Sequence, residues 1–265
     1  TKENIKFAVN TVHRICKPDG NGRVRGLDTA ELVLGVLLQQ KDLSIPLRMW
    51  NSLLRGHASN SDYVSARAVL QQIETLHERN PEQQPPPSDY HYNTVLYACA
   101  RAADDGALDM AQSLVTFIEE NRTPTIYMYN NLLHLHSRRA KTVYGAAAAA
   151  EDVLIRVSER SSLQDSSPPP NTTSFNLVIS AWSNSPEHQG AVRAKQILDL
   201  LLNLNELDAD VISFGTVIHA FGRRRQSARD VLDQAVGYFK DNQDVDMTQC
   251  WVGACYADEA THVDK

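Results

Sequence analysis

Apolar and polar positions follow a helical period along most of the chain, and one pattern of them recurs. In the segment TTSFNLVISAWS (172–183), an aromatic residue and an asparagine precede two aliphatic residues and a small residue. Four related segments keep this order: LRMWNSLLRGHA (47–58), DYHYNTVLYACA (89–100), IYMYNNLLHLHS (126–137) and VISFGTVIHAFG (211–222). Apolar residues at this spacing predict an amphipathic helix in each copy.

A second amphipathic run follows each copy. The runs are DYVSARAVLQQIETL, GALDMAQSLVTFIEE, GAAAAAEDVLIRVSE, GAVRAKQILDLLLNL and QSARDVLDQAVGYFK. Each combines alanine with aliphatic residues at helical spacing, so the predicted unit is a pair of antiparallel helices. Small residues such as Ala98 and Ala111 let the two helices of a pair approach closely. Proline-containing turns at 81–88, 122–125 and 161–171 end one pair before the next.

The residue after the aromatic is the anchor of each copy. The anchors stand at positions 51, 93, 130, 176 and 215, at separations of 37 to 46 residues. Such periods are typical of helical-repeat arrays with insertions and predict an all-α fold. We expect a degenerate N-terminal helix pair at 1–46 that acts as a cap, repeats over 47–248, and a partial sixth copy at 249–265 that begins near Gln249.

Composition excludes several classes of protein. The 265 residues are 42% hydrophobic and 22% charged with a formal charge of −6, as in soluble proteins. No apolar run approaches eighteen residues, so we expect no membrane insertion. The acidity disfavours an indiscriminate nucleic-acid binder but allows a basic stripe along one groove. Because the chain begins at Thr1 rather than at methionine, we expect the native start, with any targeting peptide, to lie outside it.

Cysteine spacing and short motifs indicate neither a metal site nor an enzyme. The four cysteines, at 16, 99, 250 and 255, are irregularly spaced, which favours a reducing compartment. In KPDGNGRVRGLD, Asp19, Asn21 and Gly22 match the middle of a calcium loop, but Lys17 occupies the first ligand position. HExxH, GxSxG and phosphate-loop motifs are absent, as is a cytidine-deaminase zinc pattern, so we predict no catalytic role and no cofactor.

The recurring order resembles the pentatricopeptide repeat family: an aromatic and an asparagine, two aliphatics, a small residue, a basic residue, then an alanine-containing helix and a closing proline. The five copies cover about residues 47–240. The tetratricopeptide repeat is a structural rival, but no copy supplies its tryptophan, Leu-Gly and tyrosine set. The resemblance implies a right-handed α-α superhelix, a solenoid whose first helices line a concave groove that binds single-stranded RNA, one base per repeat.

The resemblance also implies which residues read the bases. The base-facing anchors are Asn51, Asn93, Asn130 and Asn176, and Gly215 cannot make the contact. The second discriminators, five residues before the next anchor, are Ser88, Thr125, Asn171 and Asp210. Asn176 with Asp210 resembles a uracil-favouring pair and Asn130 with Asn171 a pyrimidine-favouring one, so the expected ligand is a pyrimidine-leaning single strand.

Two further sets of positions complete the predicted groove. Tyr90 and Tyr127, three residues before an anchor, can stack on bases. Arg101, Arg138 and Arg223, eight residues after an anchor, can meet phosphates, and Arg139, Arg224 and Arg225 extend this stripe. Each set has a structural alternative: helix caps for the asparagines, packing between repeats for the tyrosines, and helix-dipole contacts for the arginines.

The first functional hypothesis is a non-catalytic, RNA-binding helical-repeat protein that acts in RNA processing, stability or translation. The resemblance implies a mitochondrion or plastid. The alternative is a protein-interaction scaffold or a structural subunit of an organellar ribonucleoprotein such as the ribosome. The charge of −6, the glycine at 215 and the long insertions support this alternative.

Overall fold

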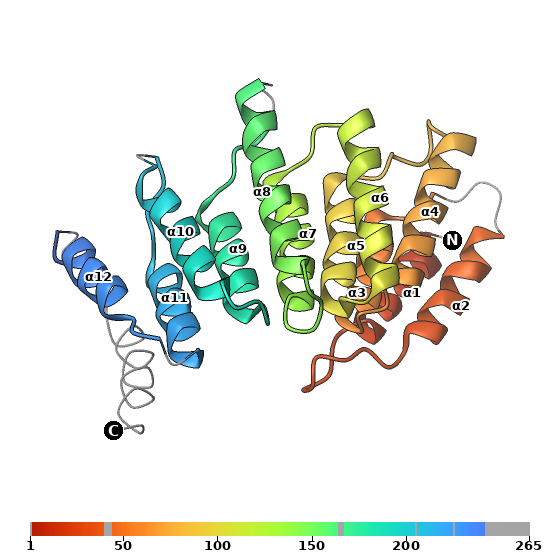
Figure 1. The fold of residues 1–265 in the computed structure, drawn as a ribbon. Coiled ribbons are helices and arrows are strands. Elements are labelled where there is room, and N and C mark those ends of the chain that lie inside the picture. Colours follow the sequence, from red (N-terminus) through yellow and green to blue (C-terminus); the bar gives the residue numbers. More distant parts are fainter. Residues whose placement is uncertain (1, 40–43, 164–166, 205, 225, 242–265) are drawn as a thin grey trace. The chain divides into compact units, whose positions relative to one another are not determined.

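The described part of the chain is built from helices alone (Figure 1). A computed structural model describes residues 2–39, 44–163, 167–204, 206–224 and 226–241. The helices in these ranges are α1 (Lys2–Ile15), α2 (Leu27–Leu38), α3 (Leu47–Ser59), α4 (Tyr63–Arg79), α5 (Asp89–Ala102), α6 (Asp105–Asn121), α7 (Ile126–Arg139), α8 (Ala146–Leu163), α9 (Thr172–Asn184), α10 (Gly190–Leu202), α11 (Val211–Arg223) and α12 (Arg229–Asp241). The predicted all-α class is confirmed.

The chain consists of two compact units, Thr1–Asn131 and Leu132–Lys265. In the first unit, α1 packs against α2 and α3, α3 packs against α4 and α5, and α5 packs against α4 and α6. In the second unit, α8 packs against α9, α9 against α10 and α11, and α11 against α10 and α12. Each unit is therefore a stack of helix pairs in which first helices touch first helices, as in α-α repeat proteins.

The core of each pair forms where the sequence pattern places it. On α6, Ala111, Leu114, Val115 and Ile118 are all buried. The small residue five positions after the anchor is also buried wherever it occurs, at Gly56, Ala98, Ala181 and Ala220. At the start of α10, a Cβ on Gly190 would lie 2.5 Å from the Trp182 carbonyl oxygen. A larger residue there would force α9 and α10 apart.

The two ends of the chain differ in what the structure describes. Helices α1 and α2 occupy the stretch in which a degenerate leading pair is expected. The predicted partial repeat at 249–265 lies outside the described residues, as does Arg225. Among the described helices, none combines the length and apolarity needed to span a bilayer.

Two cysteines in the described ranges are free thiols inside the first unit. Burial raises the pKa of the Cys16 thiol to about 11 and that of Cys99 to about 12. Because the thiolate is the reactive form, both side chains act as small apolar residues of the core.

Candidate nucleic-acid interface

The anchors lie inside the first helices, one turn from their starts. Each anchor is the fifth residue of its helix: Asn51 in α3, Asn93 in α5, Asn130 in α7, Asn176 in α9 and Gly215 in α11. All five are half-buried. A helix cap precedes the first helical residue, so the interpretation of these asparagines as caps is wrong.

Three of the four predicted second discriminators are instead the residues that cap the first helices. Ser88, Asn171 and Asp210 are the N-caps of α5, α9 and α11. Asn171 Oδ1 accepts the Ser174 N–H at 3.0 Å, and Asp210 Oδ1 accepts the Ser213 N–H at 2.8 Å. Thr125 directly precedes α7. These caps can be recognised in the sequence, since Ser, Asn or Asp before an apolar-periodic run predicts a helix start.

Asn176 is bonded directly to the discriminator with which it was paired. Its Nδ2 donates to Asp210 Oδ1 at 3.0 Å and to Oδ2 at 3.2 Å. The Ser213 hydroxyl donates to Asn176 Oδ1 at 2.6 Å. One helix start thus fixes both ends of an amide carried by the preceding first helix.

Asn51 is held by a side chain at the corresponding position of the next helix pair. His91 Nε2 donates to Asn51 Oδ1 at 2.8 Å, and His91 Nδ1 accepts the Ser88 N–H at 2.9 Å. An accepting Nδ1 means that Nε2 carries the proton and that the ring is neutral, and burial lowers the pKa of His91 accordingly. His91 and Ser213 both stand two residues before an anchor. The repeat motif alone revealed neither residue.

Asn93 is held by a different neighbour. Asn131 Nδ2 donates to Asn93 Oδ1 at 2.9 Å and to the Asn93 carbonyl oxygen at 3.3 Å. Asn131 was likewise not predicted from the sequence. Asn130 lies in the first unit and Asn171 in the second, so their pairing stays a prediction.

Positions that share the anchor's face are open to solvent in both units. Residues three before, four after and eight after an anchor lie on its side of the helix. The first of these positions is exposed in every copy, at Arg48, Tyr90, Tyr127, Thr173 and Ile212. Tyr90 is 45% and Tyr127 68% exposed. Both rings are therefore accessible for stacking on a base.

This side of the first helices in each unit, which we call the anchor face, carries positive charge. It comprises the anchors with Arg48, Arg55 and Ser59 on α3, Tyr90, Tyr97 and Arg101 on α5, Tyr127, His134 and Arg138 on α7, Thr173, Ser180 and Asn184 on α9, and Ile212, His219 and Arg223 on α11. The set includes five arginines and no carboxylate, although the whole chain has a formal charge of −6. The positions four residues after the anchors were missed, and their helical spacing could have found them.

Two of the predicted phosphate-binding arginines reach back toward the preceding first helix. Arg101 Nη2 donates to the Ser59 carbonyl oxygen at 3.4 Å, and Arg223 Nη1 donates to Asn184 Oδ1 at 3.2 Å. Ser59 and Asn184 are themselves eight residues after an anchor. Arg138 is exposed on α7.

Arg224 and Arg139 do not extend the stripe as predicted. The Arg224 guanidinium donates to the carbonyl oxygens of Ser185 at 2.7 Å and Ser183 at 3.3 Å, so it closes the C-terminal end of α9. Such carbonyls lack partners within a helix and attract cations. Arg139 is buried. Both arginines are thus structural, in line with the helix-dipole alternative.

The loop that resembles a calcium site is built by internal contacts. Asp19 Oδ1 accepts the N–H groups of Asn21 at 2.9 Å and Arg23 at 3.0 Å, and its Oδ2 pairs with Arg25 Nε at 3.2 Å. No cluster of three metal-ligating side chains occurs in the described ranges.

Among the comparisons with known proteins, the search of solved structures returned matches. No family model and no curated protein sequence matches the chain. Two solved structures of the pentatricopeptide repeat protein PPR10 with an 18-nucleotide psaJ RNA element, one of them a triple Cys-to-Ser variant, each match at 15% identity and a TM-score of 0.44. Each match covers 95% of this chain and 39% of PPR10. PPR10 from maize matches at 16% identity and a TM-score of 0.35, over 89% of this chain and 41% of that one.

The stacked helix pairs of each unit, with an asparagine as the fifth residue of most first helices, form an α-α helical-repeat fold. This is the fold that the repeat motif predicts. The chain spans about two fifths of the length of the PPR10 chains that it matches.

Proposed function

We propose that the chain binds single-stranded RNA along the anchor face, without catalysis, and acts in RNA processing, stability or translation in a mitochondrion or plastid. One observation carries this proposal: the anchor face holds five arginines in a chain of net charge −6, and Asp210 is the carboxylate bonded to one of its anchors, Asn176. Arginines attract the phosphate backbone whatever its sequence. The half-buried amides between them offer directed hydrogen bonds to bases.

The pair Asn176 and Asp210 supports a preference for uracil. The Asn176 amide is fixed by Asp210 and Ser213, so its remaining N–H has one direction. A carboxylate oxygen beside it accepts hydrogen bonds only. Together they form a donor next to an acceptor, which complements a uracil carbonyl next to N3–H. Cytosine has an acceptor at N3 and would face the carboxylate unfavourably.

Asn51 and Asn93 support a broader preference for pyrimidines. In their described contacts, each uses Oδ1 to accept from a neighbouring first helix. The Nδ2 group of each is then the part that can donate to a base. The O2 carbonyl shared by uracil and cytosine suits such a donor. Tyr90 and Tyr127 add exposed rings, and base–aromatic stacking contributes about 1–3 kcal/mol per base.

Equilibrium binding to labelled oligonucleotides tests the proposal. We expect single-stranded oligo(U) and oligo(C) to bind more tightly than oligo(A) or a duplex of the same length. The double variant Arg138→Gln/Arg223→Gln should weaken binding by about tenfold or more and flatten its salt dependence. Arg229→Gln is the matched control, because it removes an exposed arginine from α12. A preference for purines, or equal binding by the double variant and the control, would overturn the proposal.

The alternative role as a protein scaffold rests on a different surface. Leu32 and Val36 of α2 are 70% and 61% exposed. A partner that covers them would bind independently of the anchor face. Absent RNA binding by a folded parent protein would favour this alternative.

A further inference from the structure

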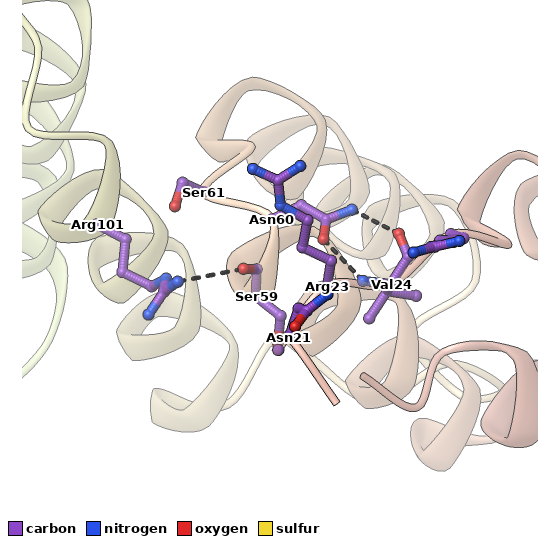
Figure 2. A pocket seen from close by; sticks show the side chains of 9 residues that line it. Asn21, Arg23, Val24, Ser59, Asn60, Ser61 and Arg101 are labelled. Atoms are coloured by element: carbon purple, nitrogen blue, oxygen red, sulfur yellow. Dashed lines mark hydrogen bonds between the residues drawn. The ribbon is translucent and has the colours of Figure 1, made fainter. Parts of the chain in front are cut away.

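A cavity of about 580 Å³ lies in the first unit, where the loop between α1 and α2 meets the C-terminal ends of α3 and α5 (Figure 2). Its lining includes Arg23 and Arg25 from the loop, Asn60 and Ser61 after α3, and Arg101 of α5. These segments are far apart in the sequence. The volume falls within the range of small-ligand sites.

The walls of the cavity are fixed by hydrogen bonds. The Val24 N–H donates to Asn60 Oδ1 at 2.9 Å, and Asn60 Nδ2 donates to the Val24 carbonyl oxygen at 2.7 Å. Asn60 therefore clamps the loop to the end of α3, as Figure 2 shows. Asp19 fixes the preceding turn through the N–H groups of Asn21 and Arg23. A ligand would meet a site that is already formed.

The charge of the cavity is opposite to that of the chain. Arg23, Arg25 and Arg101 line it, and Asp19 pairs with Arg25 at 3.2 Å. Three arginines and no carboxylate thus line the cavity, in a protein whose formal charge is −6. Arginine suits phosphate because its planar fork donates two hydrogen bonds at once.

The terminal nitrogens of Arg101 make only long hydrogen bonds within the protein. Its Nη2 and Nη1 contacts, to the Ser59 carbonyl oxygen and the Tyr97 hydroxyl, are 3.4 and 3.5 Å long. Ordinary N–H···O bonds are 2.7–3.2 Å. Its Nε atom is buried and has no hydrogen-bond partner in the described part of the chain. The long Nη contacts leave these donors of Arg101 able to bond a phosphate oxygen instead.

We propose that the cavity binds phosphate groups, with Arg23, Arg25 and Arg101 as the cationic residues of its wall, and that these phosphates belong to the backbone of RNA lying on the anchor face. Arg101 belongs to both the cavity and the anchor face, which places the two sites side by side within the first unit. The RNA source rests on the proposed function, whereas the affinity for phosphate does not.

The double variant Arg23→Gln/Arg25→Gln tests the proposal in the full chain. Both side chains are exposed, so their loss leaves the core intact. With a single-stranded pyrimidine oligonucleotide, we expect weaker binding, and a slope of log K against log salt that is shallower by about 0.7 for each phosphate that the variant no longer neutralises. Lys6→Gln, on the exposed side of α1, is the control for the loss of charge alone and should bind almost as tightly as the parent.

A second arm uses pyrophosphate and inorganic phosphate alone and follows the NMR signal of the Arg101 Nε–H group. We expect a shift in the parent and none in the double variant. Phosphate binding without an effect on RNA affinity would support the site and overturn its RNA source. No shift in the parent, with RNA binding equal in the double variant and Lys6→Gln, would overturn the proposal. In that case the preference for pyrimidines would still test the proposed function separately.

Discussion

His91 donates to Asn51 Oδ1 through Nε2 at 2.8 Å while its Nδ1 accepts the N–H of Ser88 at 2.9 Å. The side chain that bonds the backbone of the α5 N-cap, Ser88, therefore also orients an amide on α3. Ser213 does the same for α11 and Asn176. In both cases, the interaction that starts a helix is the one that positions a predicted base contact on the preceding first helix.

This relationship predicts a difference between two variants of His91. His91→Ala removes both bonds, whereas His91→Ser keeps an acceptor for the Ser88 N–H, as Ser213 accepts the Asp210 N–H, and loses only the longer reach to Asn51. Because both variants leave a similar space, we expect the serine variant to be more stable by about 1 kcal/mol. Urea unfolding at pH 7.5 measures this difference. Equal stability of the two variants would mean that the hydrogen bond from the Ser88 N–H contributes nothing.

The caps of α6 and α11 allow stability to be separated from recognition. Asp104 Oδ1 accepts the Ala107 N–H at 2.7 Å, much as Asp210 accepts that of Ser213. Asp104→Ala should therefore cost about 1 kcal/mol, and Asp210→Ala should cost more because it also removes the bonds from Asn176 and the Ser213 hydroxyl. Only Asp210→Ala also releases Asn176, so only this variant should change base preference in an RNA-binding assay. The same change in preference for Asp104→Ala would contradict this expectation.

Ala111 should not tolerate a larger side chain. It is 1% exposed on the buried face of α6, and extra methylene groups in a packed core cost about 1–3 kcal/mol. Ala111→Leu should lower the midpoint of thermal unfolding. Ala68→Leu, at an exposed position of α4, should leave the midpoint nearly unchanged. Equal midpoints for the two variants would contradict close packing at Ala111.

Stability should fall in mild acid because of His136. Burial, followed by the charges of Arg139 and Arg156, lowers the pKa of His136 from 6.5 to about 4. As the pH falls below 6.5, the unfolded chain takes up a proton that the folded chain does not. The free energy of unfolding then drops by about 1.4 kcal/mol per pH unit until about pH 4, where this contribution levels off.

A comparison with His136→Gln isolates this effect from the titration of carboxylates. Urea unfolding at pH 7.5 and pH 5 should show a larger loss of stability in the parent than in the variant. An equal loss in both proteins would mean that His136 is already free to accept a proton in the folded state.

The sequence predicts the helices because their signal is local. Apolar residues at helical spacing and small residues such as Ala98 and Ala181 are enough to place both helices of a pair and their contact. The aromatic before each anchor correctly placed Asn51 and Asn176 within the helices. Each such pattern lies within one chain segment, so it can be recognised without knowledge of the fold.

The contacts between repeats could not be predicted in the same way. His91, Ser213 and Asn131 meet their partners through the register of one first helix against the next, which differs between copies of unequal length. Arg223 and Arg224 are adjacent in the sequence, but one lies on the anchor face and the other closes α9. The cavity around Arg101 joins segments that only the folded chain brings together.

The most direct test of base reading is the substitution Asp210→Asn. Asparagine caps a helix about as well as aspartate, so the fold should be kept while the carboxylate beside Asn176 becomes an amide. The amide can donate to N3 of cytosine, and selection from a randomised single-stranded RNA pool should shift one position from uracil toward cytosine, by about tenfold. Asp104→Asn is the control. An unchanged preference in the selected pool, or the same change for the control, would contradict base reading by the anchor asparagines.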